Sequence, residues 1–254
     1  MRSALVLALG VALTACGSGQ GATDAAAGGD EVVVFAAAAL TDVLDELAAE
    51  FTAAGGPTVT LNVSGSQTLA TQILEGAPAD LFLSSDAVQM DRVAAAGHLA
   101  DGPVTVATNT LALTVEAGNP HGVRGLTDLA RPDLVVVLAA DEVPAGRYAA
   151  QVLTRAGVTV RPASLERSVR SALTKVAQGE ADAAIVYASD IVAAHRSGAS
   201  VEGVAIPVDQ NVVTTVTMAR VAGGAAPDAA DAFAALLRSE RGRGVLLEHG
   251  FGAP

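Results

Sequence analysis

The sequence predicts an α/β protein with two lobes. From Glu31 onward, short apolar runs rich in β-branched residues alternate with segments of helical periodicity, a pattern typical of a parallel sheet covered by helices. Two runs, Val104–Val115 and Val213–Ala219, have no helix within them, and we interpret them as strands that cross between the lobes. Two lobes on a pair of connecting strands can close over a ligand by a hinge motion.

The strands are predicted where β-branched and apolar residues gather between turn residues. In chain order they are Val32–Ala36, Val59–Val63, Asp80–Leu83, Val104–Ala107, Leu111–Val115, Leu134–Leu138, Ala183–Tyr187 and Val213–Ala219. One lobe would combine residues 31–108 with residues 216–254, and the other would hold residues 109–215.

Helices are predicted where apolar residues recur three and four positions apart. The predicted segments are Leu40–Phe51, Leu69–Leu74, a helix from Asp86 to about Gly97, and a late helix from Pro227 through Leu237. Asp86 followed by Gln89 supplies an N-cap signal for the third segment, and Pro227 favours the first turn of the fourth.

The overall charge argues against nucleic acid as a partner. The 254 residues carry a formal net charge of -12, whereas a phosphate backbone needs a basic surface. The four histidines are scattered, without metal-ligand spacing and with no partner thiol except Cys16, so a site for a metal cation is not expected.

The first thirty residues are interpreted as an export address. Arg2 precedes an apolar run, Ala4–Leu13, that fits a secretory signal and is too short to span a membrane. Leu13-Thr14-Ala15-Cys16 resembles a bacterial lipobox, which implies a signal peptide over residues 1–15 and a lipidated Cys16. Residues 16–30, rich in Gly and Ala, would form a flexible tether.

Five strand ends and turns carry backbone donors in place of charges: Ala36–Ala39, Ser64–Ser66, Val143–Gly146, Arg167–Val169 and Ile185–Tyr187. Helix starts leave N–H groups unpaired and carry about +0.5 charge each, so about four of them offset a dianion. The sequence thus predicts an anion site that needs no lysine or arginine.

At these turns the chain resembles the periplasmic molybdate-binding proteins of ABC-type transporters. The matching segments are Val34–Thr41, Thr68–Ile73, Gly76–Ser84, Val143–Tyr148 and Ile185–Asp190. The resemblance implies a type II periplasmic-binding fold with the ligand in the interlobe cleft. It also implies capture of molybdate or tungstate by a monomer, without a cofactor, and delivery to a membrane permease driven by an ATPase.

Carried over residue by residue, the family's oxyanion contacts fall on Ala39, Ser66, Ala145, Val169 and Tyr187. Ser66 can give a hydroxyl and a backbone N–H, and Tyr187 offers a phenolic O–H. Ala145 and Val169 can give only backbone N–H groups, which explains why apolar residues can serve a charged ligand.

Ala39 departs from the family, which commonly has serine at this position. A hydrogen bond to a charged group contributes about 1.5 to 3 kcal/mol, so the missing hydroxyl would weaken binding roughly tenfold or more if nothing replaces it. Ser84 or Ser85, at the end of the neighbouring strand, or an ordered water could supply the donor. Asp42, Asp45 and Glu46, which share one helix face, are interpreted as a solvated surface.

Three other functions remain as alternatives. Sulfate is also a proton-free dianion, and only the size of the cleft would exclude it. A hydrolase on the same fold would need a nucleophile beside a base, but no histidine lies in the matching segments. An extracytoplasmic sensor would be expected to carry an output domain, which the pattern of the chain does not suggest.

Overall fold

The computed structural model describes residues 31–254, and the predicted signal peptide, Cys16 and tether lie outside the described residues. The strands are β1 Glu31–Ala37, β2 Thr58–Ser64, β3 Leu81–Ser84, β4 Val104–Glu116, β5 Val136–Ala139, β6 Ser164–Glu166, β7 Ala183–Tyr187, β8 Val201–Ala205 and β9 Val213–Arg220. The helices are η1 Ala38–Leu40, α1 Thr41–Ala53, α2 Ser66–Leu74, α3 Ala87–Ala95, η2 Leu126–Ala130, α4 Pro144–Ala156, α5 Val169–Ala177, α6 Ala188–Arg196, α7 Pro227–Arg238 and α8 Glu240–Glu248.

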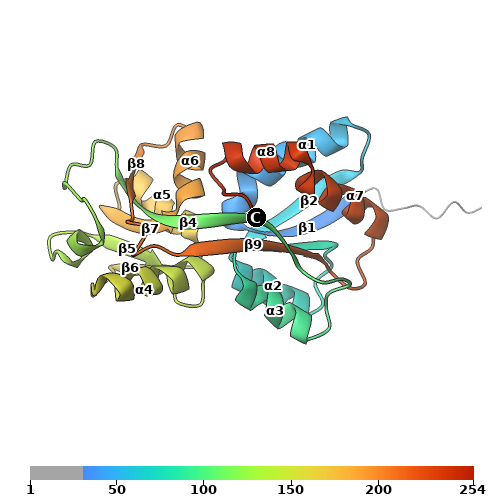
Figure 1. Cartoon of the computed structure of the whole chain (residues 1–254), viewed down its shortest axis with the longest axis horizontal. Helices are drawn as coiled ribbons and strands as arrows, with labels where there is room; N and C mark the ends of the chain where they lie inside the picture. Colours follow the sequence, from blue (N-terminus) through green and yellow to red (C-terminus); the bar gives the residue numbers. More distant parts are fainter. Residues whose placement is uncertain (1–30) are drawn as a thin grey trace, which may run out of the picture.

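The strands pair in the order β2-β1-β3-β9-β4-β7-β5-β6, with β8 on β4. One half of the molecule combines β1–β3 with helices on both faces, and the other combines β5–β7 with α4 on one face and α5 and α6 on the other (Figure 1). Within each half the neighbours β1, β2 and β3, or β5, β6 and β7, are parallel. Parallel strands end at the same edge, so the turns after β1, β2 and β3 lie together.

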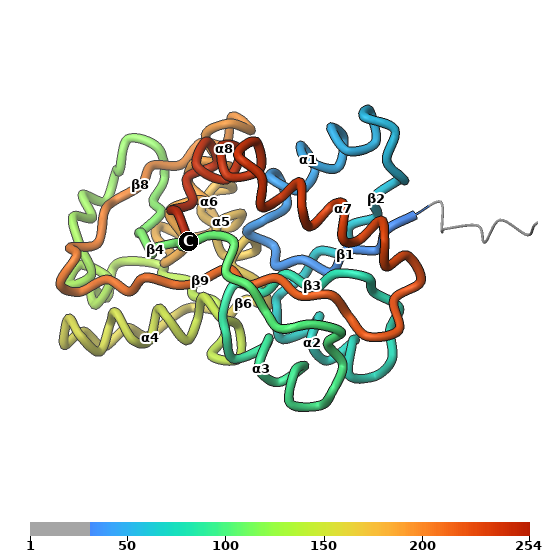
Figure 2. The backbone as a smooth tube through the Cα atoms, turned by 45° about the vertical axis from the view of Figure 1, so that its right-hand side comes forward, coloured from blue at the N-terminus to red at the C-terminus, as the bar shows by residue number. Residues whose placement is uncertain are grey.

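Two long strands, β4 and β9, connect the halves and run side by side between them (Figures 1 and 2). The two predicted strands Val104–Ala107 and Leu111–Val115 form one strand, β4, which corrects the prediction. The polar residues between them do not form a turn, because Thr108, Asn109 and Thr110 pair with β9. Beyond them β4 pairs with β7 and β8, and the predicted lobe boundaries at residues 108 and 215 fall inside these connecting strands.

η2, β6, β8 and α8 have no counterpart among the predicted strands, helices and turns. β6 and β8 are short strands with exposed positions, and α8 contains two glycines within nine residues. These features weaken the alternation of apolar and polar residues that predicts a strand and the apolar spacing that predicts a helix. The predicted strand Leu134–Leu138 is shifted to Val136–Ala139.

The first strand is buried on both faces, as expected of a parallel strand between helix layers. Val32, Val34 and Ala36 belong to the larger core, whereas Phe35 packs into a second cluster with Leu69. This packing holds β1 in place, and η1 follows directly after β1. No helix within residues 31–254 is both long and apolar enough to span a membrane.

Candidate functional site

A small cavity between the two halves is lined by residues that directly follow strands or begin helices. Its volume is about 10 Å³, measured to the centres of water-sized spheres. The lining residues are Ala37, Ala38, Ala39, Gly65, Ser66, Ser85, Val143, Pro144, Ala145, Ser168, Val169 and Tyr187. The structure therefore brings all five predicted contact residues, together with Ser85, around one buried space.

Several helices begin at this cavity. Ala37, Gly65 and Val143 are the N-cap residues of η1, α2 and α4, and within the described chain none of them caps its helix with a side-chain hydrogen bond. The start of α5 differs, because Ser168, which also lines the cavity, caps this helix by accepting the Ser171 N–H at 3.2 Å. The uncapped starts leave backbone N–H groups available to a ligand.

The cavity carries no formal charge of its own among the residues that the structure describes, because none of its lining residues is acidic or basic. An anion there would be held by helix N-termini and hydroxyl groups. Within residues 31–254, no three His, Cys, Asp or Glu residues are grouped to hold a metal ion.

Two serine hydroxyls meet at the cavity. Ser66 Oγ lies 3.2 Å from Ser85 Oγ and accepts a hydrogen bond from the Ser85 backbone N–H at 3.1 Å. Ser84 faces elsewhere, since its hydroxyl donates to the Asp86 carbonyl oxygen at 2.7 Å. Of the two serines that the sequence offers as alternatives, Ser85 lines the cavity and Ser84 does not.

Tyr187 closes one side of the cavity at the end of β7 and is 2% exposed. Burial raises the pKa of its phenol well above the ordinary value, so the group stays protonated and can donate. Among residues 31–254 its hydroxyl oxygen has no hydrogen-bond partner. The Ser85 hydroxyl is a polar side-chain group that acts to lower this pKa, and the phenol is free to donate into the cavity.

The backbone of Tyr187 is held by Asp190. The Tyr187 N–H donates to Asp190 Oδ2 at 3.1 Å at the start of α6. Asp190 is fully buried, and this burial raises the pKa of its carboxyl to about 6. Arg170 Nε lies 3.1 Å from the other carboxyl oxygen.

Gly146 allows the start of α4 to approach the end of β5. A Cβ atom at this position would overlap the carbonyl oxygens of Ala139 and Ala140, and backbone atoms cannot move aside as a flexible side chain can. Ala145, the preceding residue, lines the cavity, so this close approach helps to position its N–H.

The acidic face of α1 is not simply solvated, which corrects that interpretation for two of its three residues. Asp42 pairs with Arg170 at 2.5 Å, and Glu46 pairs with Arg241 at 2.7 Å and with His249 at 2.9 Å. Only Asp45 is exposed as expected. The sequence pattern missed these pairings because their basic partners lie far along the chain.

Comparisons with known proteins agree on one family. Residues 32–252 match the family described as bacterial extracellular solute-binding protein. Over 100% of its length the chain is 39% identical to the molybdate-binding protein ModA of Mycobacterium tuberculosis (strain H37Rv), of which it covers 98%. It is 34% identical to the molybdate-binding protein ModA of Escherichia coli K12, over 64% of this chain and 67% of that protein.

Solved structures support the same fold. The periplasmic molybdate-binding protein of Azotobacter vinelandii superposes with a TM-score of 0.78 at 21% identity, over 88% of this chain and 99% of that chain. The sulfate-binding protein SubI of Mycobacterium tuberculosis gives 0.77 at 22% identity, over 87% and 86%. The predicted type II periplasmic-binding fold is confirmed.

Proposed function

Since the chain belongs to the family of bacterial extracellular solute-binding proteins, we propose that it captures molybdate, and also tungstate, in the cavity between its lobes. Proteins of this family bind solutes for transport, and the chain is a binding protein rather than an enzyme. The observation that carries the proposal is the convergence of Ala39, Ser66, Ala145, Val169 and Tyr187 on one buried cavity without charged side chains.

The chemistry of the cavity favours an anion that carries no proton. Molybdate, tungstate and sulfate are fully ionised at neutral pH, so a site composed only of donors satisfies all their oxygens. Phosphate retains a proton at neutral pH and would benefit from a carboxylate acceptor, which the lining residues do not supply. The donor set therefore disfavours phosphate, and the full-length similarity to molybdate-binding proteins favours molybdate over sulfate.

Each contact residue has a role that its chemistry permits. Ala39, Ala145 and Val169 would donate backbone N–H groups from helix starts, Ser66 would add its hydroxyl, and Tyr187 would donate its unpartnered phenol. Ser85 would supply a second serine hydroxyl, in place of the one that is absent at Ala39. The site residues are almost completely buried, so an anion enters only when the lobes move apart.

The transport context follows from the family. The protein acts outside the cytoplasm as the binding component of an ABC importer. We propose that it works as a monomer, that Cys16 is lipidated, and that this lipid holds it at the outer face of the cytoplasmic membrane next to the permease and its ATPase. Replacing Cys16 with serine is expected to move the protein from the membrane fraction to the soluble fraction. An unchanged membrane fraction would contradict lipid anchoring.

Calorimetric titration with molybdate, tungstate, sulfate and phosphate tests the ligand assignment. We expect tight binding of molybdate and tungstate and far weaker binding of sulfate and phosphate. Preferential binding of sulfate would establish the alternative ligand, and preferential binding of phosphate would contradict the donor-only site. No binding of any of the four anions would overturn the proposed function.

A further inference from the structure

Two arginines stand beside the cavity without lining it. Arg147 lies two residues after Ala145 at the start of α4, and Arg170 lies one residue after Val169 at the start of α5. Neither belongs to the lining residues, although neighbouring positions do. Their guanidinium groups therefore serve something other than direct contact with an anion.

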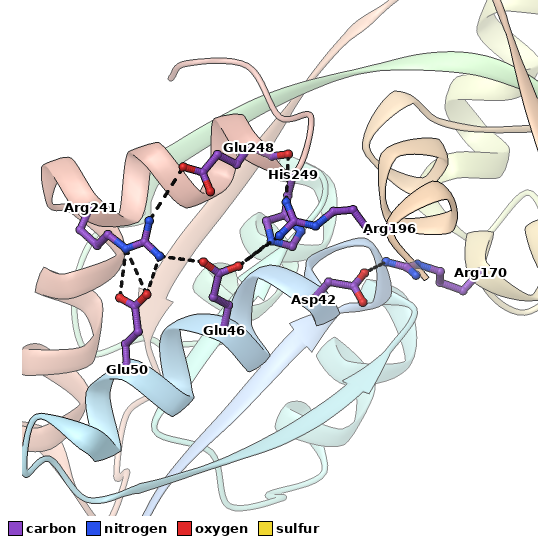
Figure 3. A network of polar contacts seen from close by, with 8 residues as sticks. All are labelled: Asp42, Glu46, Glu50, Arg170, Arg196, Arg241, Glu248 and His249. Carbon is purple, nitrogen blue, oxygen red and sulfur yellow. Dashed lines mark hydrogen bonds and ion pairs between the residues drawn. The ribbon is translucent and has the colours of Figure 1, made fainter. Parts of the chain in front are cut away.

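Both arginines reach from the half of the molecule that contains β5–β7 to the half that contains β1–β3. Arg147 pairs with Asp86, the N-cap of α3, and Arg170 pairs with Asp42 of α1 at 2.5 Å. Figure 3 shows Asp42 and Arg170 facing each other from α1 and α5. One ion pair between the lobes therefore lies beside the start of α4, and another lies beside the start of α5. Both helix starts line the cavity.

Of the two carboxylates that pair across the lobes, Asp86 is poorly solvated, with 1% of its side chain exposed. Both arginine side chains are 27% exposed. A buried carboxylate that loses its cation is strongly unfavourable, so the Arg147–Asp86 pair favours the arrangement in which the lobes are together. Asp42 is more exposed, at 40%, and can be solvated when the lobes separate.

Arg170 also connects the interlobe contact to Tyr187. Its Nη2 approaches Asp42, and its Nε lies 3.1 Å from Asp190 Oδ1. The other oxygen of Asp190 accepts the N–H of Tyr187. Closing the lobes therefore places Asp42 next to the group that orients the tyrosine at the cavity.

A third contact lies farther along α1 and supports the same arrangement. Arg196 of α6 lies 3.6 Å from Glu46, four residues after Asp42 on the same helix face (Figure 3). Its other guanidinium nitrogen donates to the Glu248 carbonyl oxygen at 3.4 Å. This contact is longer and more exposed, so we expect it to contribute less than the other two.

We propose that Arg147 and Arg170 are positioning residues for oxyanion capture, which hold the lobes closed through Asp86 and Asp42 and thereby set the residence time of the anion. The inference rests on the proposed function. It assigns the arginines to closure and not to attraction, because each is already neutralised by a carboxylate. Removing either interlobe pair should therefore accelerate dissociation and leave association nearly unchanged.

The test uses Asp42→Asn and Asp86→Asn, each of which removes an interlobe ion pair. In Asp86→Asn the side-chain oxygen of the new amide can still accept the Gln89 N–H, so α3 keeps its cap. Asp133→Asn is the matched control, because it removes the exposed Arg131–Asp133 pair outside the cavity. Molybdate association and dissociation rates are measured by stopped-flow tyrosine fluorescence, and the radius of gyration of the unliganded protein by X-ray scattering.

We expect dissociation to accelerate about five- to tenfold in Asp42→Asn and Asp86→Asn, with association changed less than about twofold. The unliganded variants should also show a larger radius of gyration, whereas Asp133→Asn should match the wild type in every measurement. Unchanged dissociation in both variants, or slower association alone, would overturn the inference. If the wild type binds no molybdate, the proposed function fails, and the scattering comparison still tests whether the pairs hold the lobes together.

Discussion

The hydroxyl groups of Ser66 and Ser85 lie 3.2 Å apart, which joins the start of α2 to the end of β3 at the cavity. The parallel pairing of β1 with both β2 and β3 brings these two junctions together. Ser85 therefore occupies a position from which it can supply a hydroxyl donor close to the one that Ala39 lacks.

Ser85→Ala is expected to weaken molybdate binding about tenfold, because a hydrogen bond to a charged group contributes about 1.5 to 3 kcal/mol. Calorimetric titration measures the change. Ser84→Ala is the matched control, since the Ser84 hydroxyl bonds only to the backbone of Asp86 and does not line the cavity. Equal affinities of Ser85→Ala and the wild type would show that Ser85 compensates nothing.

Ala39→Ser restores the hydroxyl that related proteins commonly have. Ala39 lines the cavity from η1, so the new group would add a donor at the anion. We expect affinity to rise by up to about tenfold, on the same hydrogen-bond scale. A smaller gain in the Ser85→Ala background than in the wild type would contradict the compensation by Ser85, because the added donor should matter more when Ser85 is absent.

Tyr187→Phe removes the phenolic hydroxyl and preserves the packing of the ring. Affinity for molybdate should fall about tenfold, whereas the free energy of unfolding without ligand should be unchanged or higher, because a buried hydroxyl without a partner is lost. Titration and urea unfolding measure the two effects. Tyr148→Phe serves as the control, as Tyr148 does not line the cavity. Undiminished affinity would remove Tyr187 from the site.

Gly146→Ala is expected to lower both stability and affinity, since its Cβ would overlap two backbone oxygens and displace the start of α4. We expect a loss of about 1 to 3 kcal/mol in the free energy of unfolding, the usual range for overpacking. Gly244→Ala in α8 is the control, because a Cβ there meets open space and alanine favours helix. Similar stabilities of the two variants would refute the close-packing role.

Asp190 should make stability depend on pH. Burial raises the pKa of the Asp190 carboxyl to about 6 in the folded protein. Between about pH 4 and pH 6 this carboxyl is therefore protonated in the folded protein and ionised in the unfolded chain. The carboxyl's contribution to stability is therefore most favourable below this window and is lost as the pH rises through it. A shift of about two pKa units corresponds to about 3 kcal/mol.

Urea unfolding of the wild type and of Asp190→Asn between pH 4 and pH 7 measures this contribution, because titrations common to both proteins cancel in the difference. Relative to Asp190→Asn, the wild type should lose up to about 3 kcal/mol as the pH rises from 4 to 7. A difference that does not vary with pH would show that Asp190 titrates at its ordinary pKa.

Much of the fold could be predicted because its signals are local. The strands β1, β2, β3, β7 and β9 coincide with apolar runs to within two residues, and Asp86 caps α3 as its spacing with Gln89 predicts. The division of β4 into two strands was wrong, because the pairing of Thr108–Thr110 with β9 overrides their turn-like composition. Likewise β6 depends on its pairing with β5, which no local pattern reveals.

The sequence by itself determined which groups can contact a ligand. These are backbone N–H groups at helix starts, one serine hydroxyl and one phenol, and none of the predicted contact residues is charged. Only the tertiary structure decided which side chains meet. It turned Ser85 toward Ser66 and Ser84 away, and it brought Arg170 to Asp42 across 128 positions of the chain. The physical reason is that helix starts follow from neighbouring residues, whereas contacts across the cleft depend on strand order, register and closure of the lobes.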